Sequence, residues 1–179
     1  TLADAEPWHF AADFPLDSQT NPQLRLSAAG ALLDGPAEAG TVAYQVRDDI
    51  HFFDSMGRLN RRIEKDLAPE NAKCLCFTTA PLEKDLELTG FPVEELYVTS
   101  THTDGIFLAE LEEITPDGVC HGITEGMIRG RSAAIGRNPA TDALGVPYHT
   151  SLRRDDVQLS PTEPTLLAFH LEATSRILK

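Results

Sequence analysis

Residues 107–118 read FLAELEEITPDG, and residues 121–129 continue as HGITEGMIR. Apolar residues alternate along 107–111, which is the pattern of a half-buried strand. Thr115-Pro-Asp-Gly118 follows, with a proline that presets φ and a glycine that tolerates positive φ. A helical interpretation through Phe107, Leu111 and Ile114 is the alternative, but the turn and the alternation before it favour a strand. The stretch therefore predicts a β-hairpin.

The same alternation recurs along most of the chain. It is found at residues 24–27, 41–46, 74–77, 85–89, 96–100 and 166–171, and each run is short and closed by turn-forming residues. Evenly spaced short strands of this kind are typical of an all-β sandwich or barrel. We therefore expect an all-β sandwich.

Two segments depart from this pattern. Met56, Leu59, Ile63 and Leu67 fall on one helical face, so residues 58–67 predict a helix within an insertion at 55–70, ended by Pro69. Residues 136–150 are predicted to be a long loop. Glycine and proline are spread throughout, and 179 residues suit one domain, so we expect residues 1–179 to form a single unit.

The charge of the chain excludes some classes of partner. It carries 15 basic and 28 acidic residues, a net charge of −13. Nucleic-acid affinity depends on neutralising phosphates with Lys and Arg, so we expect no nucleic acid and no anionic membrane surface as partner. The sequence lacks an apolar run long enough to span a membrane, and its first residues do not resemble a signal peptide.

The three cysteines argue against a disulfide framework and indicate a cytoplasmic protein. Cys74, Cys76 and Cys120 are predicted to be buried structural residues. Cys74 and Cys76 share a face of a predicted strand and are not expected to bond to each other. Their C-x-C spacing also differs from that of a structural zinc site, so no metal is expected.

Catalytic and nucleotide-binding motifs are absent from the sequence. Gly130-Arg-Ser132 only approaches a nucleophile elbow, since the second glycine is missing. No glycine-rich nucleotide loop occurs, and no cofactor is expected. His102 and Asp104 would share a face of a strand, where an acid–base pair is conceivable, but a local hydrogen bond is the simpler interpretation. The residues alone thus indicate an acidic β-sandwich without an evident active site.

A longer pattern resembles a known family. Residues 77–100 read FTTAPLEKDLELTGFPVEELYVTS, and they precede Asp104, the turn at Asp117 and Gly118, and TEGMIR at 124–129. In this order the motifs resemble the C-terminal domain of the Xaa-Pro dipeptidyl-peptidase-like hydrolases, the superfamily of cocaine esterase and glutaryl acylase. Pro147-Tyr148-His149 and the segment 166–175 fit the same pattern. The resemblance covers residues 24–179, and the helical segment near 55–70 departs from it.

The resemblance implies a jelly-roll β-sandwich of the galactose-binding-domain-like type. In the family this domain is non-catalytic and packs against an upstream α/β-hydrolase domain that carries a serine, a histidine and an aspartate. It walls the substrate pocket and contributes to homo-oligomer contacts, and the parent is a dipeptidyl-peptidase, esterase or acylase. The family continues with further strands beyond the position of Lys179, so the resemblance predicts a sandwich lacking its last strands, with an unpaired edge.

Ten residues carry the family motifs and are expected to have structural roles. They are Pro81, Leu82, Asp85, Gly90, Pro92, Asp104, Asp117, Gly118, Gly126 and Arg129. Asp104 is expected to accept backbone hydrogen bonds, Gly126 to allow close packing, and Arg129 to pair with an acidic neighbour.

Two other functions remain open. One is a stand-alone carbohydrate- or protein-binding jelly-roll module, because a fold does not settle a function. The other is an enzyme that uses acids and histidines in an unrecognised site.

Overall fold

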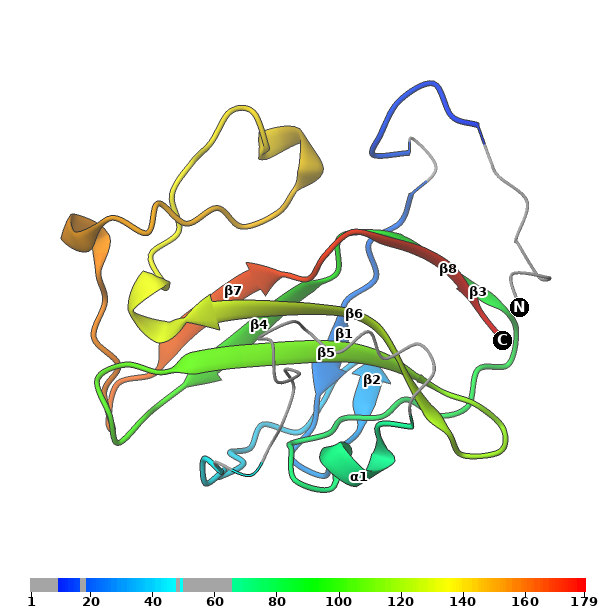
Figure 1. Ribbon diagram of the computed structural model, residues 1–179, viewed down its shortest axis with the longest axis horizontal. Helices are drawn as coiled ribbons and strands as arrows, with labels where there is room; N and C mark the ends of the chain where they lie inside the picture. The colour runs from blue at the N-terminus through cyan, green and yellow to red at the C-terminus, as the bar shows by residue number, and fades with distance from the viewer. Residues whose placement is uncertain (1–9, 17–18, 48, 50–65) are drawn as a thin grey trace.

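The computed structural model of the 179-residue chain describes residues 10–16, 19–47, 49 and 66–179. Eight strands and one short helix dominate the described part (Figure 1). They are β1 (Leu24–Leu26), β2 (Leu32–Asp34), α1 (Ala68–Asn71), β3 (Leu86–Gly90), β4 (Val93–Val98), β5 (Ile106–Ile114), β6 (Cys120–Arg129), β7 (Thr165–His170) and β8 (Thr174–Leu178). The described chain is mostly β-structure with almost no helix, consistent with an all-β sandwich.

The strands form four antiparallel pairs, β1–β2, β3–β8, β4–β7 and β5–β6. The β3–β8 and β4–β7 pairs are consecutive along the chain. Gly90 at the end of β3 faces Thr174 of β8, and Val93 at the start of β4 faces His170 of β7. The N–H of Leu171 donates to the carbonyl of Pro92 at 2.7 Å, between the two ladders. Segments 86–98 and 165–178 therefore run alongside each other, with a break at Pro92.

The β5–β6 hairpin confirms the strand interpretation of residues 107–114. Its turn is closed by the Gly118 N–H, which donates to the Thr115 carbonyl at 2.8 Å. Gly118 has a φ of +85°, a conformation that glycine adopts without the steric cost a β-carbon would bring. The register shifts between Leu111 and Glu112, so a bulge interrupts the hairpin.

The hydrophobic core lies between hairpin β5–β6 and ladder β4–β7. Its buried members are Ile128, Ala133, Leu159, Leu167 and Phe169. Leu96 and Val98 of β4 and Phe107 and Ala109 of β5 pack against this cluster. The inward residues alternate with outward ones along β4, as the period of a strand requires.

Two predicted strands are wrong. Residues 41–46 have no strand partner among the described residues, although their apolar residues alternate. Residues 74–77 are likewise irregular, and beside them Thr78 makes only an isolated bridge to Ala31. Alternation favours an extended chain, but a strand also needs a neighbouring ladder, which local sequence does not reveal.

The predicted helix at 58–67 lies almost wholly outside the described residues. Pro69, expected to end that helix, lies instead in the first turn of α1. Proline is favoured there because its missing N–H would have no partner inside the helix. The predicted loop at 136–150 is confirmed, since it contains one 3-10 turn and no strand.

The cysteines are less buried than predicted. Cys120 is buried, Cys74 is half-buried and Cys76 is exposed, and none of the three forms a disulfide. The prediction fails for Cys76 because it assumed a strand at 74–77. No helix among the described residues is long and apolar enough to cross a membrane.

Candidate functional site

A hollow of about 350 Å³ lies where β6, β7 and the segment between them meet. That segment stands at one end of the strands, drawn from yellow to orange (Figure 1). The polar side chains around the hollow are those of Arg129, Ser132, Tyr148, His149, Ser151 and His170, with Met127, Ile128 and Pro147 beside them. None of these residues is acidic, in a chain with 28 acidic residues. The hollow is therefore rich in hydrogen-bond donors and free of carboxylates.

His149 holds the segment around the hollow against the sheet. Its Nδ1 lies 3.1 Å from the carbonyl oxygen of Ala134, and its Nε2 lies 2.8 Å from that of Ala168 in β7. A neutral imidazole donates through one nitrogen only, whereas the imidazolium ion donates through both. The contact fixes the neighbouring Tyr148 and Ser151 beside β7. Ser151 has a φ of +53°, which is uncommon for a residue other than glycine.

Asp104 binds Arg129, Arg131 and the backbone of Gly105 next to the hollow, and we call this group the Asp104 clamp. Its Oδ2 lies 2.8 Å from Nε of Arg129 and 3.0 Å from Nε of Arg131. Its Oδ1 accepts the backbone N–H groups of Gly105 at 2.9 Å and Arg131 at 3.2 Å. The clamp therefore ties the loop after β4 to the end of β6, and it orients Arg129 at the hollow.

The electrostatics of the clamp favour the ionised carboxylate. Burial acts to raise the pKa of Asp104, but the hydrogen bonds from Arg129, from the two backbone N–H groups and the charge of Arg129 outweigh it, so this pKa is lowered. Arg131 also lies 3.7 Å from Asp156. Two arginines thus face two aspartates, and the group is close to neutral.

Gly126 permits a close approach between β6 and the end of β7. A β-carbon at this position would lie 2.5 Å from the His170 carbonyl oxygen and 2.9 Å from Cα of Leu171. Both neighbours are backbone atoms, which cannot move aside as a flexible side chain can. Gly126 therefore lets β6 pack directly on the residue that lines the other side of the hollow.

The structure brings Asp104, Gly126 and Arg129 to this region and leaves the other motif residues elsewhere. Pro81, Leu82 and Asp85 lie in the exposed irregular segment before β3. Gly90, with a φ of +133°, and Pro92 form the break between β3 and β4. Asp117 and Gly118 form the hairpin turn, where the Thr115 hydroxyl donates to the Asp117 carboxylate.

The catalytic candidates considered from the sequence make other contacts in the structure. The partners of Asp104 are arginines and backbone amides, whereas the backbone N–H of His102 bonds to the Ser100 hydroxyl. Among the described residues, no group of three or more His, Cys, Asp or Glu residues is arranged to hold a metal ion. Ser132 lies in a single 3-10 turn after β6 rather than at a nucleophile elbow.

Sequence reasoning missed Arg131, Asp156 and the two carbonyl contacts of His149. The resemblance marked Pro147-Tyr148-His149 as a family motif without assigning it a contact. Arg131 and Asp156 carry no local signal, since their pairing joins positions 25 residues apart that only the fold brings together.

Comparison with known proteins identifies the family of the chain. The model of the X-Pro dipeptidyl-peptidase C-terminal non-catalytic domain matches residues 1–179. The chain belongs to this family. This family is the one that the motifs of residues 77–129 resemble.

Two relatives show the kind of protein in which this domain occurs. A Mycobacterium bovis protein named "Putative serine esterase" is 38% identical over 114 residues, which is 64% of this chain and 18% of that protein. The cocaine esterase of a Rhodococcus species is 24% identical over 166 residues, 82% of this chain and 28% of that enzyme. The chain spans less than a third of the length of these relatives.

Proposed function

We propose that this chain is the accessory β-domain of a larger serine hydrolase, packed against an upstream α/β-hydrolase domain. Catalysis then resides upstream, where a serine attacks the carbonyl, a histidine carries the proton and backbone N–H groups stabilise the oxyanion. The names of the relatives favour an ester as substrate over a peptide or an acylated amine. Residues 1–179 form one jelly-roll domain of the galactose-binding-like type in this proposal.

The observation that carries the proposal is a set of exposed apolar side chains that line the hollow or are close neighbours, in sequence or across a ladder, of residues beside it. Met127, which lines it, is 46% exposed, and Ile106, the cross-strand neighbour of Arg129, is 75% exposed. Leu152 follows Ser151 and is 45% exposed. Ile135 is 56% exposed and precedes Gly136, whose N–H donates to the Tyr148 carbonyl at 2.8 Å. Clustered exposed apolar side chains mark a surface that another domain covers.

The chemistry of the hollow's lining is compatible with a face that borders a substrate pocket. Its lining offers donors from Arg129 and Tyr148 and no carboxylate, while both ring nitrogens of His149 are taken by backbone carbonyl groups. Such a wall tolerates a partly negative carbonyl oxygen or the carboxylate product of ester hydrolysis without like-charge repulsion. The Asp104 clamp and the His149 contacts keep the wall in place, as a preorganised surface requires.

The test compares charge insertions in the intact parent protein. Met127→Glu and Ile106→Glu should each lower kcat/KM for ester hydrolysis by about 10-fold or more, because a buried unpaired charge at a domain contact costs several kcal/mol. Tyr97→Glu is the matched control, since Tyr97 is 76% exposed on β4 and does not line the hollow. Equal activity in all three variants would refute the proposed contact.

A second measurement tests whether a parent protein exists. An antibody against this domain should detect a native protein of about 60–70 kDa, the expected size of a hydrolase with one accessory domain. The isolated chain should not hydrolyse esters. A native band at 20 kDa would instead favour the stand-alone binding module, and the hydrolase function would be withdrawn.

A further inference from the structure

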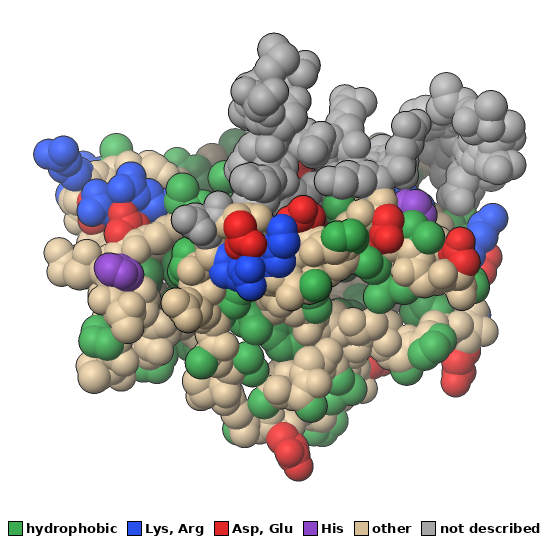
Figure 2. All heavy atoms as spheres, turned by 60° about the horizontal axis from the view of Figure 1, so that its bottom comes forward, with side chains coloured by type: hydrophobic (Ala, Val, Ile, Leu, Met, Phe, Trp, Pro, Cys, Tyr) green, Lys and Arg blue, Asp and Glu red, His purple; other side chains and the backbone are tan. Residues whose placement is uncertain are grey.

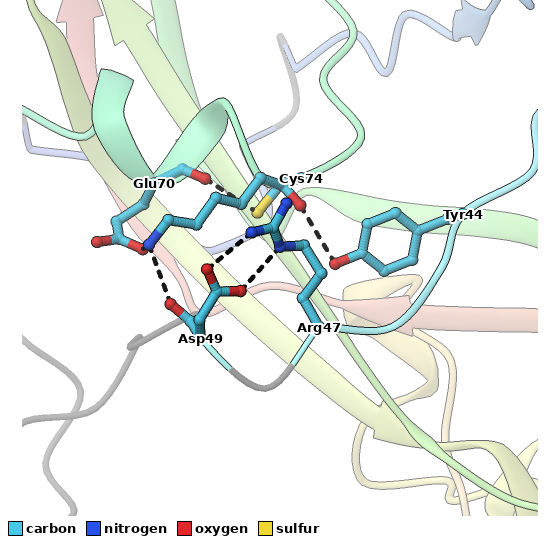
Figure 3. A network of polar contacts seen from close by, with 6 residues as sticks. Tyr44, Arg47, Asp49, Glu70 and Cys74 are labelled. Atoms are coloured by element: carbon cyan, nitrogen blue, oxygen red, sulfur yellow. Dashed lines mark hydrogen bonds and ion pairs between the residues drawn. The ribbon is translucent and has the colours of Figure 1, made fainter.

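The three cysteines converge on the short helix α1, away from the hollow described above. The Cys74 thiol lies 3.5 Å from the Glu70 carbonyl oxygen, and Figure 3 shows it beside that residue. The Cys76 thiol lies 3.4 Å from the carbonyl oxygen of Asn71, the last residue of α1. Cys120, the first residue of β6, is held by the Asp66 carboxylate, which accepts its N–H at 3.1 Å.

Asn71 connects two of these thiols. Its carbonyl oxygen contacts the Cys76 thiol, and its side chain is near the Cys120 thiol. The backbone carbonyl of Cys120 accepts the N–H of Leu67, just before α1, at 3.0 Å. Its Nδ2 also donates to Glu112 of β5 at 2.6 Å, which fixes the side chain. Two cysteines that are 44 positions apart in the sequence are therefore neighbours around one residue.

The thiols of Cys76 and Cys120 differ in their exposure to solvent. Cys76 is exposed and lies in the irregular stretch 75–77, which belongs to no helix or strand. Cys120 is only 7% exposed and belongs to the β-hairpin. One thiol is thus accessible to a dissolved oxidant, and the other is protected and held in a sheet. An exposed thiol next to a protected one can serve as attacking and resolving cysteine.

We propose that Cys76 and Cys120 form a redox-responsive thiol pair, which hydrogen peroxide closes into a disulfide. The Cys76 sulfur attacks one peroxide oxygen, the O–O bond breaks, and a sulfenic acid and one water form. The Cys120 sulfur then attacks the Cys76 sulfur, the S–O bond breaks, and a second water leaves. The two thiols lose two protons and two electrons, and peroxide is reduced to two waters.

The environment makes the reaction slow at neutral pH. Burial raises the pKa of Cys76, and the nearby charges of Cys74 and Glu112 add to this effect. Burial also raises the pKa of Cys120, with a further contribution from Glu112. Because the thiolate is the reactive form, the pair responds to sustained oxidation and reacts faster as the pH rises.

Closure would join the stretch after α1 to the start of β6. The same stretch is already tied by Lys73, whose Nζ contacts the backbone oxygen of Asp49 at 2.9 Å (Figure 3). Cys74 is the poorer partner for Cys76, because only one residue separates them and the ring would be strained. The proposal is independent of the hydrolase assignment.

The test oxidises the folded chain with hydrogen peroxide and maps the products by mass spectrometry. We expect the loss of two hydrogen atoms and a linked peptide pair that contains Cys76 and Cys120. Cys74→Ser should form the same link, and Cys76→Ser, at an exposed position, should not. The link should also form at least tenfold more slowly in urea, where Asn71 no longer holds the thiols together.

Three outcomes would overturn the proposal. They are a link between Cys74 and Cys76, oxygen adducts on three unlinked cysteines, and an equal rate of linking in folded and unfolded chain. Cys120→Ala serves as a second variant, with circular dichroism to confirm its fold. In Cys74→Ser only Cys76 and Cys120 remain, so a disulfide that forms in this variant must join these two residues.

Discussion

The backbone of Gly126 lies so close to the His170 carbonyl that a β-carbon there would come within 2.5 Å of the oxygen. This contact joins hairpin β5–β6 to the end of β7, beside the hollow. The neighbouring hydrogen bond from the Thr124 hydroxyl to the Glu172 carbonyl, at 2.6 Å, joins the same two segments. The position of the hollow wall therefore depends on a residue without a side chain.

Gly126→Ala is expected to destabilise the domain by about 1–3 kcal/mol, because overpacking against backbone forces the strands apart. For a chain of this size that corresponds to a fall in Tm of roughly 2–4 °C per kcal/mol. Gly105→Ala is the control, since its β-carbon would meet only Phe107 at 3.7 Å. Equal melting curves for both variants would contradict the close packing.

Asp104→Asn is expected to lower the Tm at pH 7 by a few degrees, because it removes the charge that holds Arg129 and Arg131. The native pKa of Asp104 is lowered despite burial, so its contribution to stability is present above the unfolded value of about 3.9 and is lost as the pH falls. The variant should therefore lose less stability than the wild type on acidification below that value.

The control for this prediction is Asp142→Asn. Asp142 pairs with Arg137 at 2.7 Å, and the side chain of Arg137 is 86% exposed. Exposed pairs contribute little to stability. Thermal melts from pH 3 to pH 7 should show a smaller fall in Tm on acidification for Asp104→Asn than for Asp142→Asn. If the Tm of Asp104→Asn falls as much as that of the wild type, the clamp does not stabilise the fold.

Glu94→Gln is expected to raise the Tm at pH 7 by a few degrees. Glu94 lies on the inward side of β4, next to Leu96, and burial, with a smaller effect of Glu95, raises its pKa. A raised carboxyl pKa means that the folded state binds the proton more tightly than the unfolded state does. Its ionisation therefore costs stability as the pH rises through the folded pKa, and glutamine removes this cost.

Thermal melts between pH 4 and pH 8 check this prediction. Glu83→Gln, in the exposed segment before β3, is the control and should change stability by less than about 0.5 kcal/mol. A Tm of Glu94→Gln at or below the wild-type value at pH 7 would show that Glu94 is stabilised as the carboxylate.

The pKa of Asp49 should be about 2, because Arg47 donates two hydrogen bonds to its carboxylate at 2.8 and 2.7 Å (Figure 3). NMR titration of the side-chain carboxyl carbon measures it directly. Arg47→Gln should raise this pKa toward its ordinary value. An unchanged pKa of Asp49 in Arg47→Gln would assign the shift to another cation, and Lys73 is the candidate. Acidic and basic side chains also lie next to one another on the face that Figure 2 turns forward.

Local sequence predicted the parts of the fold that depend on local conformation. The β5–β6 hairpin follows from alternation closed by Thr115-Pro-Asp-Gly118, since both signals act within a few residues. The predicted strand at residues 41–46 was wrong, because the same alternation there finds no ladder among the described residues. The Cys76 prediction failed for the same reason.

The sequence by itself determined the class of the domain and its family. The order of motifs from residue 77 to residue 129 indicated a non-catalytic C-terminal domain, and the family match bears this out. It also determined that this chain carries no nucleophile elbow.

The tertiary structure decided which motif residues act together. It brought Asp104 to Arg129 and Arg131, set Gly126 against His170, placed His149 between two carbonyl groups, and gathered Cys76 and Cys120 around Asn71. Local pattern cannot show these contacts, because all of them except the one between Cys76 and Asn71 join residues at least 15 positions apart. Backbone geometry makes a strand, but only packing brings distant side chains within reach of one another.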